Sequence, residues 1–248
     1  MIINAIKTER VTTGSVNLLD LIASSVKELH ENDILVITSK VVSLCEGSTV
    51  PIEGTDKQEL INQQADLYFP SHSGAFNINF TITGHHLIAS AGIDESNGDG
   101  VYVLWPRGPQ TTANQVRHFL QQHYGVEHIG VIITDSTNRP MQRGVIGIPL
   151  AHSGFDAIRR YAGEPDLFGR TIKVSTANIS GGLSAAAVVA MGEGDEQTPL
   201  CRISDATFVT FQDRDPSDEE LAEINIQLQD DLFAPFLTAV DWRTTNKS

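Results

Sequence analysis

Apolar and polar positions alternate along the chain in short blocks, and these blocks predict a mixture of helices and strands. Helical spacing and helix start and stop signals indicate helices at about residues 17–30, 57–67, 112–124, 155–161 and 183–191, and a last helix that opens at Asp215-Pro216-Ser217. Buried runs or strict alternation indicate strands at residues 34–37, 76–82, 87–91, 101–105, 129–134, 171–176 and 207–211. Because hairpins interrupt the strand–helix order, we predict an α+β fold rather than a doubly wound nucleotide-binding sheet.

Turn signals link several of these predicted elements. Gly84-His85 and the Asn-Gly-Asp-Gly run at residues 97–100 would join the strands of residues 76–105 into an antiparallel meander. Residues 48–70 are predicted to form an irregular excursion, and residues 136–154, rich in Gly, Pro and Arg, are predicted to be loop. The last helix has an apolar stripe that must cover apolar surface in this chain or in a second copy. The stripe consists of Leu221, Ile224, Leu228 and Leu232.

Composition and charge exclude several classes of partner. The 248 residues are 40% hydrophobic and 19% charged, which is typical of a globular protein with one large domain or two small ones. The formal charge of −14 repels nucleic acid and anionic membranes, so we expect neither as a partner. An anionic substrate would therefore need metal ions or a local group of basic side chains. The two cysteines and the lack of a long apolar run or an apolar N-terminal segment predict a cytoplasmic protein.

Common short motifs of nucleotide and hydrolase sites are absent from the sequence. It has no GxxxxGKS/T phosphate loop, no GxGxxG after a strand, no HExxH and no GxSxG. The run that begins at Asp94 resembles a calcium loop, but Asp99 occupies the position of the invariant glycine and Trp105 the position of the final glutamate. Function must therefore be sought in side chains that are far apart in the sequence.

Three acidic residues follow the ends of predicted apolar elements. Asp94 follows LIASAGI, Asp135 follows GVIIT, and Glu193 lies between two glycines just after the Ala-rich helix. Carboxylate oxygens suit Mg²⁺ and Mn²⁺, which usually take only one or two such ligands from the protein. Each acid also has a simpler explanation: Asp94 could open an Asn-Gly hairpin, Asp135 could cap a turn, and Glu193 could be solvated. A divalent cation site is therefore a hypothesis at this point.

Four segments, in this order along the chain, resemble the F(420)-0:gamma-glutamyl ligase family. They are AGIDESN, GVIITDSTNRPMQRGVIG, PDLFGRTIKV and MGEGDEQTP. The resemblance covers residues 17–203 and is strongest over residues 87–200. It implies a two-lobed α+β fold with mixed, largely antiparallel sheets, in which residues 1–248 form one ligase unit and residues of about 155–203 are a candidate second, smaller lobe. It also implies an intertwined homodimer.

The resemblance also implies an activity. Enzymes of this family use GTP and divalent metal to join L-glutamate to the lactyl-phosphate side chain of a deazaflavin coenzyme. For this chain it implies GTP or ATP as co-substrate, two Mg²⁺ or Mn²⁺ ions, L-glutamate, and a coenzyme acceptor of the deazaflavin F(420) or folate type. The expected reaction proceeds through an acyl phosphate.

Roles can be carried over residue by residue within these motifs. Asp94, Asp135 and Glu193 would be metal ligands. Nucleotide and phosphate contacts would come from Ser39, Lys40, Asn97, Ser136, Met191, Gly192, Gly194, Asp195, Glu196, Gln197 and Thr198. We take Asp135, Arg139 and Arg143 as candidate catalytic residues. The two arginines follow Asp135 in the chain, and arginine binds phosphate and carboxylate groups well. The alternative for the two arginines is a solvated surface.

The chain departs from the family pattern around this predicted centre. Leu44 replaces a nucleotide-contacting lysine, residues 9–12 replace a Gly-x-Pro segment, and residues 180–182 read Ser-Gly-Gly instead of Ala-Asp-Glu. Pro149–Gly154 replaces a Gly-rich segment. The predicted metal centre is retained while its surroundings change, which favours related chemistry on a different acceptor. The alternatives are a nucleotide- and metal-binding module without ligase activity and a metal-dependent phosphohydrolase.

Overall fold

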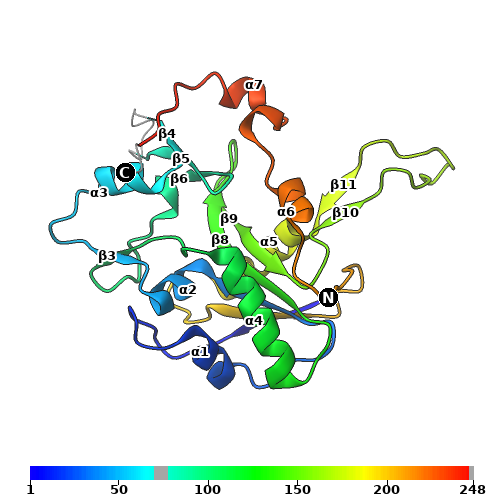
Figure 1. Cartoon of the computed structure of the whole chain (residues 1–248), viewed down its shortest axis with the longest axis horizontal. Coiled ribbons are helices and arrows are strands. Elements are labelled where there is room, and N and C mark those ends of the chain that lie inside the picture. Colours follow the sequence, from blue (N-terminus) through cyan, green and yellow to red (C-terminus); the bar gives the residue numbers. More distant parts are fainter. Residues whose placement is uncertain (70–77, 246–248) are drawn as a thin grey trace.

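The computed structural model describes residues 1–69 and 78–245, and a five-stranded sheet lies at its centre (Figure 1). The strands occur in the order β1-β12-β2-β8-β9, and only β2 and β8 run parallel. Their bounds are β1 Ile2–Ile6, β2 Ile34–Thr38, β8 Gly130–Asn138, β9 Val145–Ser153 and β12 Leu200–Ser204. This mixed, mainly antiparallel sheet with separate helices confirms the predicted α+β class.

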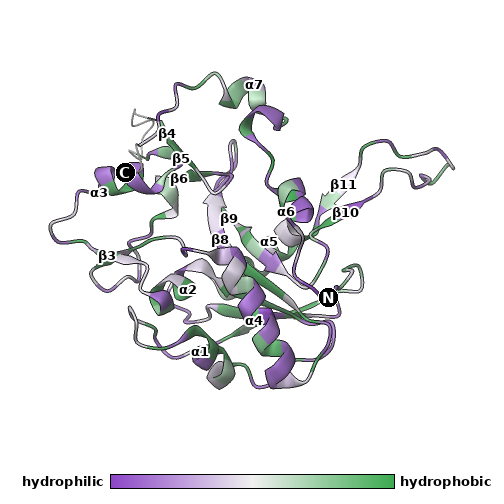
Figure 2. Cartoon of the chain, viewed as in Figure 1, coloured by the Kyte–Doolittle hydropathy of each residue, from purple (hydrophilic) through white to green (hydrophobic). Residues whose placement is uncertain are grey.

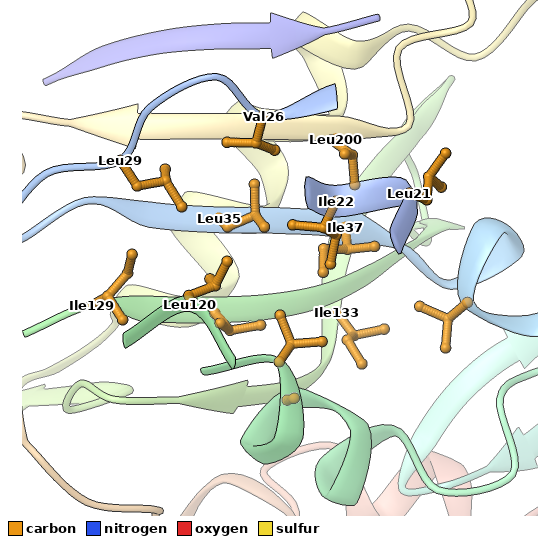
Figure 3. Close-up of a cluster of buried hydrophobic side chains, with 14 of the residues drawn as sticks. Leu21, Ile22, Val26, Leu29, Leu35, Ile37, Leu120, Ile129, Ile133 and Leu200 are labelled. Atoms are coloured by element: carbon orange, nitrogen blue, oxygen red, sulfur yellow. The ribbon is translucent and has the colours of Figure 1, made fainter. Parts of the chain in front are cut away.

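Helices cover both faces of the central sheet. They are α1 Leu18–Ser25, α2 Ser39–Glu46, α4 Pro109–Tyr124 and α5 Ile179–Met191. The apolar run of β2 is fully buried because its alternate side chains enter two different cores. Leu35 and Ile37 pack with α1 and α4 (Figure 3), while Ile34 and Val36 pack with α5. In Figure 2, α4 has both hydrophilic and hydrophobic segments, as expected for a helix with one buried side.

Smaller elements form a second layer beside the sheet. They are β3 Thr49–Pro51, α3 Lys57–Gln64, β4 Leu67–Tyr68, β5 Phe80–Thr83, β6 His86–Ala89, the 3₁₀ turn η1 Ser90–Gly92 and β7 Val101–Val103. The short helix within the predicted excursion is confirmed as α3, and a third apolar cluster forms between α3, η1 and β7. The segment before residue 78 of the predicted strand 76–82 lies outside the described residues.

The predicted meander is only half right. β5 and β6 form the expected hairpin, but β7 pairs with β3 and not with β6. Ser90 and Ala91 have left-handed backbone angles, with φ of 52° and 56°, and so turn the chain away from the edge of β6. A turn of this kind has no clear signal in Ser or Ala.

The prediction that residues 136–154 form a loop is wrong. β8 continues to Asn138 and pairs with β9 in a long antiparallel hairpin, whose turn spans residues 139–144. Pro149 lies at the point where the register shifts, between Ile133 and Thr134, and there it is compatible with a strand. Gly147 lies against α5: a Cβ there would be 2.3 Å from the carbonyl oxygen of Ser184. Gly and Pro thus serve strand packing here instead of interrupting it.

Three further predictions after residue 154 are wrong. Residues 155–161 do not form a helix, residues 171–176 are mostly irregular, and in residues 207–211 only Phe211 makes a bridge, with Phe155. Instead, β10 Ile158–Arg160 and β11 Thr176–Asn178 pair at the base of an arm that projects from the body (Figure 1). Phe155 is buried in the core, so its apolar character reflects packing and not a helix.

The C-terminal part begins as predicted and then departs from the expected helix. Ser217 forms a capping box with Glu220 at the start of α6, Asp218–Ile224. The helix ends at Ile224, and η2 Leu228–Asp230 and α7 Ala234–Leu237 follow, so the apolar stripe is not one helical face. Among the described residues, no helix combines the length and apolar character required to cross a membrane.

Candidate functional site

A cleft of about 470 Å³ opens where β2 ends beside β8. Parallel pairing aligns Thr38 with Thr134, so the residues that follow Thr38 lie beside those that follow Thr134. The backbone N–H of Thr38 donates to Pro199 at 3.0 Å, which brings the chain between α5 and β12 to the same place. The carboxyl ends of parallel strands are a frequent location for ligands because several loops converge there.

The fold brings most of the predicted site residues to this cleft. Those that line it are Ser39, Lys40, Asp94, Asn97, Asp135, Ser136, Met191, Gly192, Glu193, Gly194, Asp195, Glu196, Gln197 and Thr198. Arg139 and Arg143 do not line it, because β8 continues past Asp135 and carries both to the exposed hairpin turn. At about 3.3 Å per residue, Arg139 begins roughly 13 Å beyond Asp135. The structure therefore does not bring the two arginines to the three acids.

Asp94 is held by the only lysine that lines the cleft in the described chain. Lys40 Nζ lies 2.5 Å from Asp94 Oδ2, and Ser96 donates to Asp94 Oδ1 from its backbone N–H at 2.8 Å and its hydroxyl at 2.9 Å. Burial by itself would raise the pKa of Asp94, but the Lys40 ammonium and the Ser96 donors outweigh it and lower that pKa. Asp94 is therefore an anion with a fixed orientation.

Asp135 lies deeper in the site and has a different environment. Its burial raises its pKa to about 6, against the opposing effect of the Ser136 backbone N–H and of donors from Trp105 and Ser39. The negative charge of Asp94 raises this pKa further. The indole Nε1 of Trp105 donates to Asp135 Oδ2. Trp105 is a site residue that the sequence analysis missed, since only folding places it beside Asp135.

Glu193 belongs to a loop that is held by hydrogen bonds from Ser136 and Asn97. Ser136 Oγ lies 3.4 Å from Glu193 Oε2, and Asn97 Nδ2 donates to the carbonyl of Gly194 at 3.0 Å. Burial raises the pKa of Glu193, and the charge of Asp94 acts in the same direction. Gly192 has φ of +82°, and a Cβ there would be 2.4 Å from Glu196 Cδ, so glycine is required for this loop conformation.

The chemistry of these residues fits a divalent cation that arrives with phosphate groups. Within residues 1–69 and 78–245, no three His, Cys, Asp or Glu side chains are close enough to hold a metal ion by themselves. Asp94, Asp135 and Glu193 nevertheless share one cleft, and the charge of Asp94 raises the pKa of the other two. Magnesium sites often combine one or two carboxylates with water and phosphate oxygens, and the cleft supplies the carboxylates of such a donor set.

Residues at which the chain departs from the expected family pattern also line the cleft. Thr8, Glu9, Arg10 and Val11 line it, and the Thr8 backbone N–H donates to Gln197 at 3.0 Å. Leu44, where the sequence resemblance leads us to expect a lysine, is buried and contributes an apolar part of the wall. His152 does not line the cleft. Its ring packs against Phe155, and burial lowers its pKa to about 4.

The fold and the cleft define an α+β protein with a carboxylate-lined binding site. The family model described as F420-0:Gamma-glutamyl ligase matches residues 5–205, and the chain belongs to this family. It is 33% identical over 215 residues to the coenzyme F420:L-glutamate ligase of Methanopyrus kandleri, an alignment covering 79% of this chain and 84% of the relative. It is 31% identical to the coenzyme F420:L-glutamate ligase of Methanocaldococcus jannaschii, over 77% of this chain and 82% of that one. The protein of this name from Methanococcus maripaludis strain C6 is 34% identical, over 72% and 77%.

Proposed function

We propose that the chain is a gamma-glutamyl ligase that uses a nucleoside triphosphate, GTP or ATP, and divalent cations to join L-glutamate to a carboxylate of a coenzyme. The acceptor is a deazaflavin of the F(420) type or a folate-like molecule. The observation that carries this proposal is the convergence of Asp94, Asp135, Glu193 and Lys40 on one cleft, in a chain of this ligase family.

The reaction requires activation of a carboxylate, because forming an amide from a free carboxylate is unfavourable in water. An acceptor carboxylate oxygen attacks the γ-phosphorus of the nucleotide, and the nucleoside diphosphate leaves. The amine of L-glutamate then attacks the acyl carbon of this acyl phosphate, so that an amide forms and phosphate leaves. Bound Mg²⁺ or Mn²⁺ would supply positive charge to the phosphates during transfer.

The protein's own residues then have distinct tasks. Asp94, Asp135 and Glu193 would hold the cations, and the Lys40 ammonium would exchange Asp94 for a phosphate oxygen. Ser39 follows the end of β2, and Ser136 lies within β8. Both line the cleft and can donate a hydrogen bond from their hydroxyl groups. Cations and Lys40 together would offset the overall charge of −14, which otherwise repels a nucleotide.

We also propose that the protein acts as a homodimer. The arm between β10 and β11 exposes three apolar side chains, and the C-terminal part exposes three more. Their exposed fractions are 93% for Leu167, 83% for Phe168, 85% for Val174, 86% for Leu232, 61% for Phe233 and 75% for Phe236. A projecting element with apolar residues at its tip is stabilised when a second copy covers it.

A direct assay tests the ligase proposal. The protein is incubated with GTP or ATP, Mn²⁺ or Mg²⁺, L-glutamate, and either a deazaflavin without glutamate or a folate. Mass spectrometry should show the acceptor gaining one glutamyl unit, with one phosphate released for each amide formed. Phosphate release that does not depend on L-glutamate would instead indicate a phosphohydrolase.

One departure from the family favours a second candidate function. Leu44 gives the cleft an apolar wall where the sequence resemblance implies a lysine, and this is compatible with a nucleotide-binding module that has no ligase activity. In that case nucleotide binding would strengthen with metal while no glutamyl product forms with either acceptor.

A further inference from the structure

The hydrogen bond from Trp105 to Asp135 comes from outside the cleft. Trp105 does not line the cleft, yet its Nε1 donates to Asp135 Oδ2. An indole N–H can only donate, so this contact takes one lone-pair position of Oδ2 and restrains the rotation of the carboxylate. Trp105 therefore restrains how the carboxylate of Asp135 is oriented in the cleft.

The indole ring is fixed on several sides. A Cβ at Gly92 would be 2.1 Å from the indole Nε1, and a Cβ at Gly84 would be 3.4 Å from Cζ3. The ring of His86 meets the indole edge-on, with ring centres 5.8 Å apart and an angle of 89° between the planes. His86 is itself placed by the carbonyls of Gly84 and Pro149, at 2.7 and 3.2 Å from its ring nitrogens. The direction of the indole N–H is therefore set by its surroundings.

The same backbone segment also positions Asp94. Asp94 and Val103 exchange both of their backbone hydrogen bonds, at 3.0 and 2.8 Å, two residues before Trp105. Gly92, which makes room for the indole, lies two residues before Asp94. Trp105 thus connects the loop that carries Asp94 to the strand that carries Asp135.

We propose that Trp105 is a positioning residue that orients the carboxylate of Asp135 relative to Asp94 for the cation that accompanies the nucleotide. This proposal rests on the metal dependence in the proposed function. Groups that orient metal ligands typically affect metal affinity or activity by about 10- to 100-fold when removed.

Trp105→Phe tests the proposal because it removes the N–H and keeps an aromatic ring. Trp242→Phe is the matched control: Trp242 Nε1 donates to the Leu237 carbonyl at 2.7 Å, in the C-terminal part and outside the cleft lining. Binding of Mn²⁺ together with a GTP analogue that cannot transfer its γ-phosphate is measured by electron paramagnetic resonance. We expect about 10- to 100-fold weaker Mn²⁺ binding for Trp105→Phe and less than about a twofold change for the control. Equal Mn²⁺ affinity in both variants would overturn the proposal.

A fluorescence measurement covers the case in which Trp105→Phe does not fold. In Trp242→Phe, Trp105 is the remaining tryptophan, because the chain contains two. Mn²⁺ with the GTP analogue should change its emission with the same dissociation constant as the resonance experiment, and unchanged emission at saturation would overturn the proposal.

Neither measurement requires turnover, so the two proposals can fail separately. A Trp105 effect on Mn²⁺ binding, without any glutamyl product, would refute the ligase reaction and support the positioning role. A wild-type protein that does not bind Mn²⁺ would refute both.

Discussion

Each of the three acidic side chains in the cleft has a hydrogen-bond or ion-pair partner of its own. Asp94 has Lys40 and Ser96, Asp135 has Trp105, and Glu193 has Ser136. Each carboxylate thus has an ordered position before a ligand arrives, which reduces the cost of organising the site on binding. Substitutions of Asp135 and of Lys40 separate the contribution of the carboxylates from that of the ammonium.

Asp135→Asn keeps the shape of the side chain and removes its charge. We expect turnover to fall by about 100-fold or more, as for the loss of one preorganised charge-stabilising group, while circular dichroism and thermal unfolding stay close to wild type. Asp20→Asn is the control, because Asp20 is exposed on α1 and does not line the cleft. Near-wild-type turnover of Asp135→Asn would contradict the proposal that Asp135 is a metal ligand.

Lys40→Met keeps most of the aliphatic stem and removes the ammonium. We expect about 10- to 100-fold weaker nucleotide binding in calorimetry, since charge-assisted hydrogen bonds contribute about 1.5–3 kcal/mol. Lys57→Met is matched to it: Lys57 pairs with Glu95 at 2.8 Å but does not line the cleft. If the two variants bind nucleotide equally, Lys40 has no phosphate contact.

At the scale of elements, α5 packs against the β8–β9 hairpin, and its C-terminal end borders the cleft. Gly147 of β9 allows α5 to approach the sheet, and the end of α5 leads directly into the loop that carries Glu193. The start of the same helix contains Gly182, where a Cβ would meet nothing within 4 Å. Substitution of the two glycines by alanine should therefore change the free energy of unfolding in opposite directions.

Alanine at each position tests this difference. Gly182→Ala should raise the free energy of unfolding by about 0.5–1 kcal/mol, because alanine loses less backbone entropy in a helix. Gly147→Ala should lower it by about 1–3 kcal/mol, because its Cβ would collide with the Ser184 carbonyl. Urea unfolding measures both, and destabilisation by Gly182→Ala would show that α5 does not have the described surroundings.

The whole molecule has a packed body and parts that project from it. The body contains the two cores on either side of the central sheet, and the arm extends away from it (Figure 1). The C-terminal segment returns to the second layer, where Arg243 exchanges backbone hydrogen bonds with Tyr68 at 2.9 Å. Large apolar side chains on the arm and on the C-terminal segment are mostly exposed to solvent within the described chain.

Phe168→Asp tests the proposed homodimer at the arm. We expect analytical ultracentrifugation to show a dimer for the wild type and a shift towards monomer for the variant, because a charge in an apolar interface is unfavourable. Val189→Asp is the comparison, since Val189 is 83% exposed but lies on α5 and not on the arm. A wild-type monomer at micromolar concentration would contradict the homodimer.

Local pattern determined the elements whose signal is strong over a short stretch. The apolar run at β2, the periodicity of α4 with Gly125 as its left-handed end, and the Ala-rich α5 were all predictable. The positions of Asp94 shortly after η1 and of Glu193 shortly after α5 were also predictable, but Asp135 lies within β8 and not at its end. β1, α2 and β12 were not predicted. β1 and β12 are as long as β2, but Asn4 and Arg202 interrupt their apolar runs.

Only the tertiary structure decided the partners of these elements and residues. Gly147 and Pro149 appear to be turn residues in the sequence, but α5 and a register shift make them part of a strand. Trp105 and Asp135 are 30 residues apart, and no local pattern indicates that they meet. Sequence alone thus determined residue type and local position, which was enough to predict most of the side chains that line the cleft. Their convergence depends on the parallel pairing of β2 with β8 and on the return of the chain from α5 to β12. These are long-range contacts that form only when the two cores assemble.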